Sequence, residues 1–102
     1  MKCQPSDVFW NQLQKLEGDE GCLAKLMPIL VVLVDELVEI PCSQYGRAVL
    51  PVFKKSMLRI NEVGASIETV ERDSLLGVLY NLGELVGISR ESYYLEEWRG
   101  DW

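Results

Sequence analysis

The chain has 102 residues, of which 48% are hydrophobic and 25% are charged, and its net charge is −6. This length supplies one hydrophobic core but not two, so we expect a single domain spanning residues 1–102. The balance of apolar and charged residues excludes a disordered chain. The acidic sequence pI of about 4.6 repels nucleic acid, so nucleic-acid binding is not expected.

The residue types that carry chemistry exclude further classes. The sequence contains no histidine, which removes histidine general bases, Cys-His and Ser-His-Asp arrangements and histidine-based metal sites. The three cysteines, Cys3, Cys22 and Cys42, lack the spacing of metal-ligand pairs. We therefore predict free thiols in a cytoplasmic protein that is not an enzyme and binds no cofactor.

The start of the chain and its longest apolar run indicate no membrane partner. The first residues, MKCQPSD, do not form the apolar segment of a secretory signal. The run LMPILVVLV, bounded by Lys25 and Asp35, is about half the ~20 residues that a membrane span requires. We interpret this run as a buried core segment.

The first predicted helix covers residues 6–17. Phe9, Leu13 and Leu16 recur at helical spacing, and Gly18 follows in the position of a C-terminal cap.

The second predicted helix, residues 22–40, is apolar on nearly every side. Asp19 is its N-cap candidate, and Pro41 ends it. Pro28 interrupts the pattern, because a proline in a helix interior costs about 3 kcal/mol. The helix therefore either kinks at Pro28 or begins anew at residue 27, with Pro28 in a first turn that tolerates it.

The third predicted helix lies within residues 43–63 and ends at Gly64. Pro51 raises the same question as Pro28, and a helix that begins at residue 50 would place it in the first turn. The apolar stripe of this helix is Val49, Val52, Phe53, Met57, Ile60 and Val63.

The fourth predicted helix covers residues 66–86 and ends at Gly87. It contains Gly77 and Gly83, each of which costs up to ~1 kcal/mol relative to alanine in a helix interior. We interpret both glycines as sites where another helix packs closely, either within the domain or from a second subunit. The apolar stripe is Val70, Leu75, Val78, Leu79 and Leu82, continued by Leu85 or Val86.

A short final helix is predicted after Ser89, its N-cap candidate. The fold class is therefore an all-α, single-domain bundle of about five helices, two of them interrupted or started by Pro28 and Pro51. The predicted core is Phe9, Leu13, Leu16, Leu30, Leu33, Leu37, Phe53, Met57, Ile60, Leu75, Leu79 and Leu82.

The end of the chain is the first candidate site. Residues 89–102, SRESYYLEEWRGDW, place four of the nine aromatic residues among acids. We expect Tyr94, Leu95 and Trp98 to dock on the core, which leaves other aromatic rings exposed as anchors for a partner. The predicted partner-binding residues here are Tyr93, Glu96, Glu97, Asp101 and Trp102.

A second candidate surface carries Asp35, Glu36 and Glu39. Asp35 and Glu39 lie one helical turn apart, the minimal arrangement for a cation. A solvated helix face is the favoured interpretation, since carboxylate metal sites in bundles normally add Glu-x-x-His pairs. We therefore predict no metal ligands and treat these acids as partner-binding residues.

Charge is unevenly distributed along the chain. Residues 43–63 carry a balance of +3, which leaves −9 for the remainder of a chain whose net charge is −6. Arg47, Lys55 and Arg59 share one helix face. We expect this face to be solvated or to meet acidic residues, including those of another copy of the chain.

Three functional hypotheses follow. The leading one is a small acidic protein-binding module, a stoichiometric inhibitor of the immunity-protein type, that covers a basic site on a partner protein. The alternative is a structural or regulatory helical homodimer, held by the apolar second helix and by the face of Gly77 and Gly83. The third is a carboxylate-based metal protein.

Overall fold

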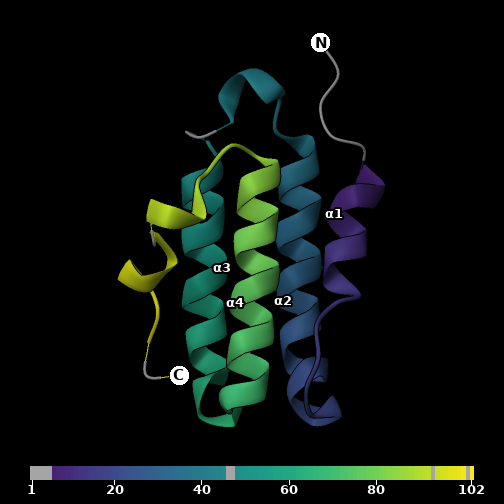
Figure 1. Ribbon diagram of the computed structural model, residues 1–102, viewed down its shortest axis with the longest axis vertical. Coiled ribbons are helices and arrows are strands. Elements are labelled where there is room, and N and C mark those ends of the chain that lie inside the picture. Colours follow the sequence, from purple (N-terminus) through teal and green to yellow (C-terminus); the bar gives the residue numbers. More distant parts are fainter. Residues whose placement is uncertain (1–5, 46–47, 93, 101) are drawn as a thin grey trace.

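The computed structural model describes residues 6–45, 48–92, 94–100 and 102, with only the backbone of Cys42 and Ala65 (Figure 1). Every regular element of these residues is helical, so the predicted all-α fold is confirmed. The α-helices are α1 (Ser6–Leu13), α2 (Glu20–Glu39), α3 (Val49–Val63) and α4 (Thr69–Leu85). Short 3₁₀ turns are η1 (Cys42–Gln44), η2 (Gly64–Ser66), η3 (Arg90–Ser92) and η4 (Tyr94–Glu97).

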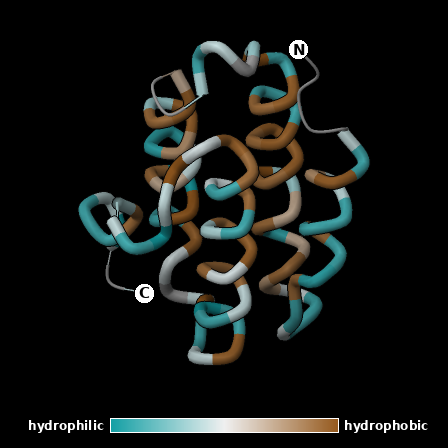
Figure 2. Tube along the Cα trace, turned by 45° about the horizontal axis from the view of Figure 1, so that its top comes forward, coloured by the Kyte–Doolittle hydropathy of each residue, from teal (hydrophilic) through white to brown (hydrophobic). Residues whose placement is uncertain are grey.

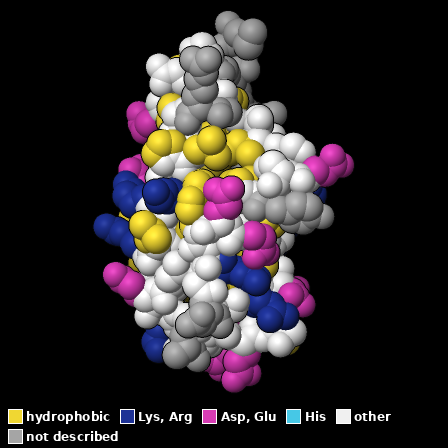
Figure 3. Space-filling view, turned by 90° about the vertical axis from the view of Figure 1, so that its left-hand side faces the viewer, with side chains coloured by type: hydrophobic (Ala, Val, Ile, Leu, Met, Phe, Trp, Pro, Cys, Tyr) yellow, Lys and Arg dark blue, Asp and Glu magenta, His cyan; other side chains and the backbone are white. Residues whose placement is uncertain are grey.

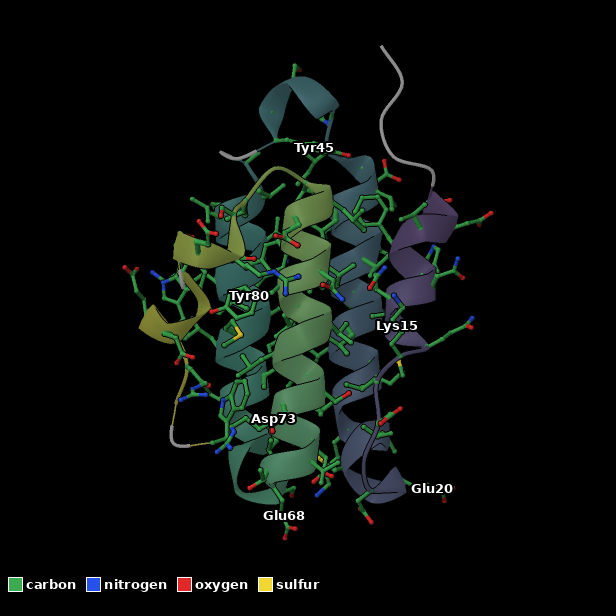
Figure 4. The ribbon with its side chains drawn as sticks, viewed as in Figure 1. Lys15, Glu20, Tyr45, Glu68, Asp73 and Tyr80 are labelled. Atoms are coloured by element: carbon green, nitrogen blue, oxygen red, sulfur yellow. The ribbon has the colours of Figure 1, made fainter. Side chains whose placement is uncertain are left out.

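The four α-helices lie along the long axis of a molecule whose extents are 41 × 26 × 20 Å. The helices α2 and α3 pack side by side, and α1 contacts both α2 and α4. Figures 1 and 2 both show α4 lying across one side of the α2 and α3 pair. Figure 4 places Glu20 and Glu68, near the beginnings of α2 and α4, at the same end of the bundle. Neither view shows a described element on the side of α2 and α3 opposite α4.

The predicted core is confirmed, since all of its residues are buried: Phe9, Leu13, Leu16, Leu30, Leu33, Leu37, Phe53, Met57, Ile60, Leu75, Leu79 and Leu82. The assignment of Val70 to the inner stripe of the fourth helix is wrong, because its side chain is 60% exposed. Nine positions at 100° each place Val70 on the side of α4 opposite Leu79.

The two prolines behave differently. Pro28 lies inside α2, so the predicted helix start at residue 27 is wrong. The Asp19 side chain accepts a hydrogen bond from the Cys22 backbone N–H at 3.1 Å, and α2 begins at Glu20, about two turns earlier. Pro28 and Ala24 are both exposed, so the backbone bond that proline cannot make lies on the solvent side.

Pro51 lies in the first turn of α3, as predicted, because α3 begins at Val49. The described residues 43–45 and Ala48 do not belong to this helix, because residues 43 and 44 are part of η1 and α3 begins only at Val49. A proline at position 51 has no N–H for the carbonyl four residues earlier, so the helix cannot extend back through it without losing a bond.

Buried Glu71 fixes the junction between α1 and α2 against α4. Its carboxylate accepts hydrogen bonds from the backbone N–H of Asp19 at 3.3 Å and of Glu68 at 3.2 Å. Gly18 has a φ of 144°, and a Cβ there would overlap the Glu71 side chain. Gly18, predicted as the C-terminal cap of the first helix, thus leaves room for the Glu71 carboxylate, which holds the junction of α1 and α2 against α4.

Candidate functional site

The C-terminal segment, defined here as residues 94–100 and 102, packs along α3 and the end of α4 (Figure 1). Tyr94 is 7% exposed and Leu95 is fully buried, which confirms their predicted docking. The Tyr94 ring makes edge contacts with Phe53, Tyr80 and Trp98, at centroid distances of 5.7, 5.6 and 6.2 Å. Aromatic pairs in this geometry are worth about 0.5–1.5 kcal/mol beyond their buried area.

Gly83 explains why Tyr94 fits. A Cβ at Gly83 would overlap the Tyr94 hydroxyl oxygen, so the predicted close packing at this glycine is confirmed. The packing partner is the C-terminal segment of the same chain. Burial, followed by the influence of Tyr80 and Glu84, raises the pKa of the Tyr94 hydroxyl well above its ordinary value. Tyr94 therefore remains neutral, as a side chain enclosed in the core must.

Trp102 does not lie where the sequence placed it. The expectation of an exposed ring is wrong, because Trp102 is only 6% exposed. Its indole Nε1 donates to Asn61 Oδ1 at 2.6 Å, and the backbone N–H of Gly100 donates to the same oxygen at 2.8 Å. Asn61 Nδ2 in turn donates to the Trp98 carbonyl oxygen at 2.8 Å. One amide side chain thus fastens the end of the chain to α3.

Asn61 is the residue that sequence reasoning missed. It follows Ile60 and lies four positions after Met57, so it borders the inner stripe of α3. A polar amide at the edge of such a stripe is a signal that a partner for its donor and acceptor lies nearby. The indole N–H of a buried tryptophan needs a partner of this kind.

Of the remaining predicted residues of the C-terminal region, the structure describes Glu96 and Glu97. Glu96 and Glu97 are exposed, and Glu96 forms an ion pair with Arg99 at 3.2 Å. Tyr93 and Asp101 lie outside the described residues. Within the described part, the end of the chain serves as a cap on the core that carries two outward carboxylates.

The second predicted acidic group lies elsewhere. Asp35 and Glu39 are exposed on α2, and Glu36 forms an ion pair with Lys55 of α3. Figure 1 shows η4 on the far side of α3 from α2, so the two acidic groups do not make one surface. The basic helix face was expected to contact acidic residues, and Lys55 does so within the chain through its ion pair with Glu36. Arg47 lies outside the described residues.

The structure brings together a different candidate surface, on the side of α2 and α3 turned away from α4. Two bridges cross this side: the Glu36–Lys55 pair, and the hydrogen bond from Lys25 Nζ to Ser66 Oγ at 3.2 Å. We call it the α2–α3 face and define it by the exposed residues Val31, Val32, Asp35 and Glu39 of α2 and Lys54, Leu58 and Arg59 of α3.

Large apolar side chains are exposed on this face. Val31 is 36%, Val32 37% and Leu58 51% exposed, whereas the other large exposed apolar side chain of the described residues, Val70, lies on α4. Figure 3 looks onto the edge of the bundle formed by α3 and the C-terminal segment, where Lys and Arg side chains lie beside apolar ones. The exposed residues that define the α2–α3 face are three apolar and four charged side chains, and protein-binding surfaces combine both kinds.

Gly77 differs from Gly83. No neighbouring atom lies within 4 Å of a Cβ built at Gly77, so no other described part of the chain packs closely there, and packing by a second subunit stays a prediction. Gly77 instead forms part of an open hollow of about 490 Å³ between α4 and the end of α1 (Figure 4). The hollow is lined by Lys15, Glu17, Val70, Asp73, Ser74, Gly77, Val78 and Asn81.

Cys22 is a buried free thiol. Desolvation raises its pKa above the ordinary 9.0, and the nearby carboxylates of Glu71 and Asp19 act in the same direction. The protonated thiol is a poor nucleophile, so this position is inert near neutral pH. Cys3 and the side chain of Cys42 lie outside the described residues.

Among the described residues, no group of three or more Cys, Asp or Glu side chains is placed to hold a metal ion. No helix in the same part of the chain combines the length and apolarity needed to cross a membrane. No family model, curated protein or solved structure matches this chain.

Proposed function

We propose that this protein is a protein-binding module of the stoichiometric-inhibitor type, which docks through the α2–α3 face onto a basic, partly apolar surface of its partner. The observation that carries the proposal is the exposed apolar stripe of α2. No polar residue occurs from Leu26 to Val34, so the outward positions in this part of α2 are necessarily apolar. A contiguous exposed apolar patch of this kind marks interaction surfaces on soluble proteins.

The acids beside the stripe support the same assignment. Asp35, Glu36 and Glu39 occupy the C-terminal half of α2, and its last turn contains no basic residue. A helix C-terminus carries a partial negative charge, so each acid near it costs about 0.3–1 kcal/mol in stability. An arrangement that lowers helix stability is explained if these carboxylates steer a cationic partner into contact.

The C-terminal segment has a smaller part in this proposal than the sequence suggested. Trp102 and Tyr94 are buried by the chain itself and offer no anchor area. Glu96 and Glu97 remain available to add to the negative field that attracts a basic partner.

Copurification from the native host, followed by mass spectrometry, tests the proposal when it is run with two matched variants. Val32→Lys places a cation on the α2–α3 face, and Val70→Lys places the same side chain on α4, where the valine is also exposed. We expect Val32→Lys to weaken partner retention at least about tenfold. Val70→Lys should retain the partner as the wild type does.

Equal retention by the two variants would remove the α2–α3 face from the proposal. Both substitutions are at exposed positions, so melting temperatures near that of the wild type are expected and serve as the check on folding.

A further inference from the structure

The two helices of the α2–α3 face differ in the balance of their exposed charges. On α2 the outward residues after the apolar stripe are Asp35 and Glu39, and neither makes an ion pair within the described residues. On α3 the exposed charged residues around Leu58 are Lys54, Lys55, Arg59 and Glu62, which leaves a balance of +2. Two neighbouring helices on one face therefore carry opposite charge, and the basic one is itself a surface of the kind that the acidic one is suited to bind.

The two bridges show which parts of α2 and α3 lie side by side along the bundle axis. The Glu36–Lys55 pair places the acidic part of α2 level with the first half of α3. The bond between Lys25 and Ser66 places the beginning of α2 level with the end of α3. The two helices are antiparallel, so Val32 lies at the level of Leu58 and its neighbours, about one turn from the Glu36–Lys55 pair.

A two-fold axis parallel to the helices would pair the acidic side chains of α2 with the basic side chains of α3 in a second copy. Such an axis exchanges the left and right sides of the face and keeps its ends together, so α2 of one copy lies against α3 of the other. Asp35 and Glu39 then meet Lys54 and Arg59 of the second copy, and Val31 and Val32 meet Leu58. The contact forms twice, once on each side of the axis.

An axis perpendicular to the helices gives a poorer match. It sets α2 against α2 with opposite ends together, so that Asp35 and Glu39 face the beginning of the second α2. Lys25 lies there beside Glu20, which leaves little net positive charge to meet the two acids.

We infer that the basic surface bound by the α2–α3 face belongs to a second copy of this chain, in a parallel two-fold dimer that pairs α2 with α3. The inference rests on the proposed function, because it uses the same face and names its partner. Two adjacent helices are about 20 Å wide, and the 15 residues of α3 are about 22 Å long. A contact of roughly 450 Å² a side lies at the weak end of specific interfaces, so the dimer should be concentration-dependent.

Sedimentation velocity of the full chain tests the dimer directly. We expect the wild type to shift from monomer toward dimer between about 10 µM and 1 mM at low salt, and to shift back at 0.5 M salt because the charge pairs are screened. Monomer at every concentration and salt would overturn the inference.

Charge exchange tests the pairing of α2 with α3. The acidic-side variant, Asp35→Lys with Glu39→Lys, and the basic-side variant, Lys54→Glu with Arg59→Glu, should each associate at least about tenfold more weakly than the wild type. An equimolar mixture should associate again, because both contacts of the mixed dimer then pair opposite charges. A mixture as monomeric as its components would contradict the parallel arrangement.

A control separates local pairing from overall charge. Glu17→Lys with Glu91→Lys changes the net charge from −6 to −2, as the acidic-side variant does, but at exposed positions outside the α2–α3 face. It should leave association within about twofold of wild type, and an equal loss would contradict the assigned interface. If the wild type is monomeric but the Val32→Lys variant no longer retains a copurifying protein, the dimer is refuted and the proposed function stands. No effect of Val32→Lys in either experiment would refute both.

Discussion

The C-terminal segment and the outer side of α2 both place large apolar side chains among carboxylates, yet the structure treats them in opposite ways. Trp102 and Tyr94 turn inward and are buried, whereas Val31 and Val32 remain exposed. The difference lies in what the rest of the chain supplies. Gly83 leaves room for Tyr94, and Asn61 gives Trp102 an acceptor. In the described chain nothing comparable covers the outer side of α2, so its apolar side chains remain available to another molecule.

The largest effect that sharpens this comparison is expected at Trp102. We predict that Trp102→Ala lowers the free energy of unfolding by about 3–4 kcal/mol, because it removes a buried ring and leaves Asn61 without its indole donor. Urea denaturation monitored by circular dichroism measures this loss. A change below about 1 kcal/mol would mean that the ring is exposed and available to a partner.

A second test contrasts the two sides of α2. Leu33 is fully buried and Val32 is 37% exposed. We predict that Leu33→Ala costs about 3 kcal/mol, through lost burial and an unfilled cavity, and that Val32→Ala costs less than about 0.5 kcal/mol. The same denaturation experiment serves for both variants. Similar losses at the two positions would indicate that the outer side of α2 is covered within the chain.

A third test uses the two glycines of α4. A Cβ at Gly83 would overlap the Tyr94 hydroxyl, so Gly83→Ala should cost about 1–3 kcal/mol by forcing the C-terminal segment away. Gly77→Ala should instead stabilise the protein by about 0.5–1 kcal/mol, since alanine is the better helix former and meets no atom within 4 Å. Thermal melts of the two variants should shift in opposite directions. A loss of stability at Gly77 would show that something packs against it.

The smallest effect concerns pH. Burial raises the pKa of Cys22 above 9.0, so the folded protein holds this proton more tightly than the unfolded chain does. Its contribution to stability is fully present below pH 9.0 and is lost as pH rises through the folded pKa, since the unfolded thiol ionises first. Unfolding free energies measured from pH 7 to 10.5 should fall more steeply above pH 9 for the wild type than for Cys22→Ala. If the unfolding free energies of both proteins fall equally with pH, the Cys22 thiol is exposed to solvent.

The helical fold and its core could be predicted from the sequence because apolar spacing follows directly from the geometry of a helix. Leu33 and Phe53 are examples whose burial their own spacing indicates. The continuation of α2 through Pro28 could not be predicted, since its cost depends on whether the affected carbonyl lies in solvent. Val70 was assigned to the stripe although nine positions separate it from Leu79, a spacing that helix geometry places on the opposite side.

The candidate site was harder to predict because it depends on contacts between distant parts of the chain. The burial of Trp102 requires Asn61, which lies 41 residues away in sequence. The α2–α3 face likewise arises only when two separate helices are brought together. The acids Asp35 and Glu39 were recognisable as a surface from their spacing, but their basic neighbours on α3 were recognisable only as a separate stripe.

If the outer side of α2 is an interface and the C-terminal segment is an intramolecular cap, the two regions should respond differently to protein concentration. A concentration series of heteronuclear NMR spectra tests both regions at once, with side-chain methyl groups reporting on the α2–α3 face and indole N–H groups on the cap. We expect the methyl signals of Val31, Val32 and Leu58 to shift as the protein is concentrated, while the indole signals of Trp98 and Trp102 remain in place. Indole signals that shift while these methyl signals remain fixed would contradict this assignment.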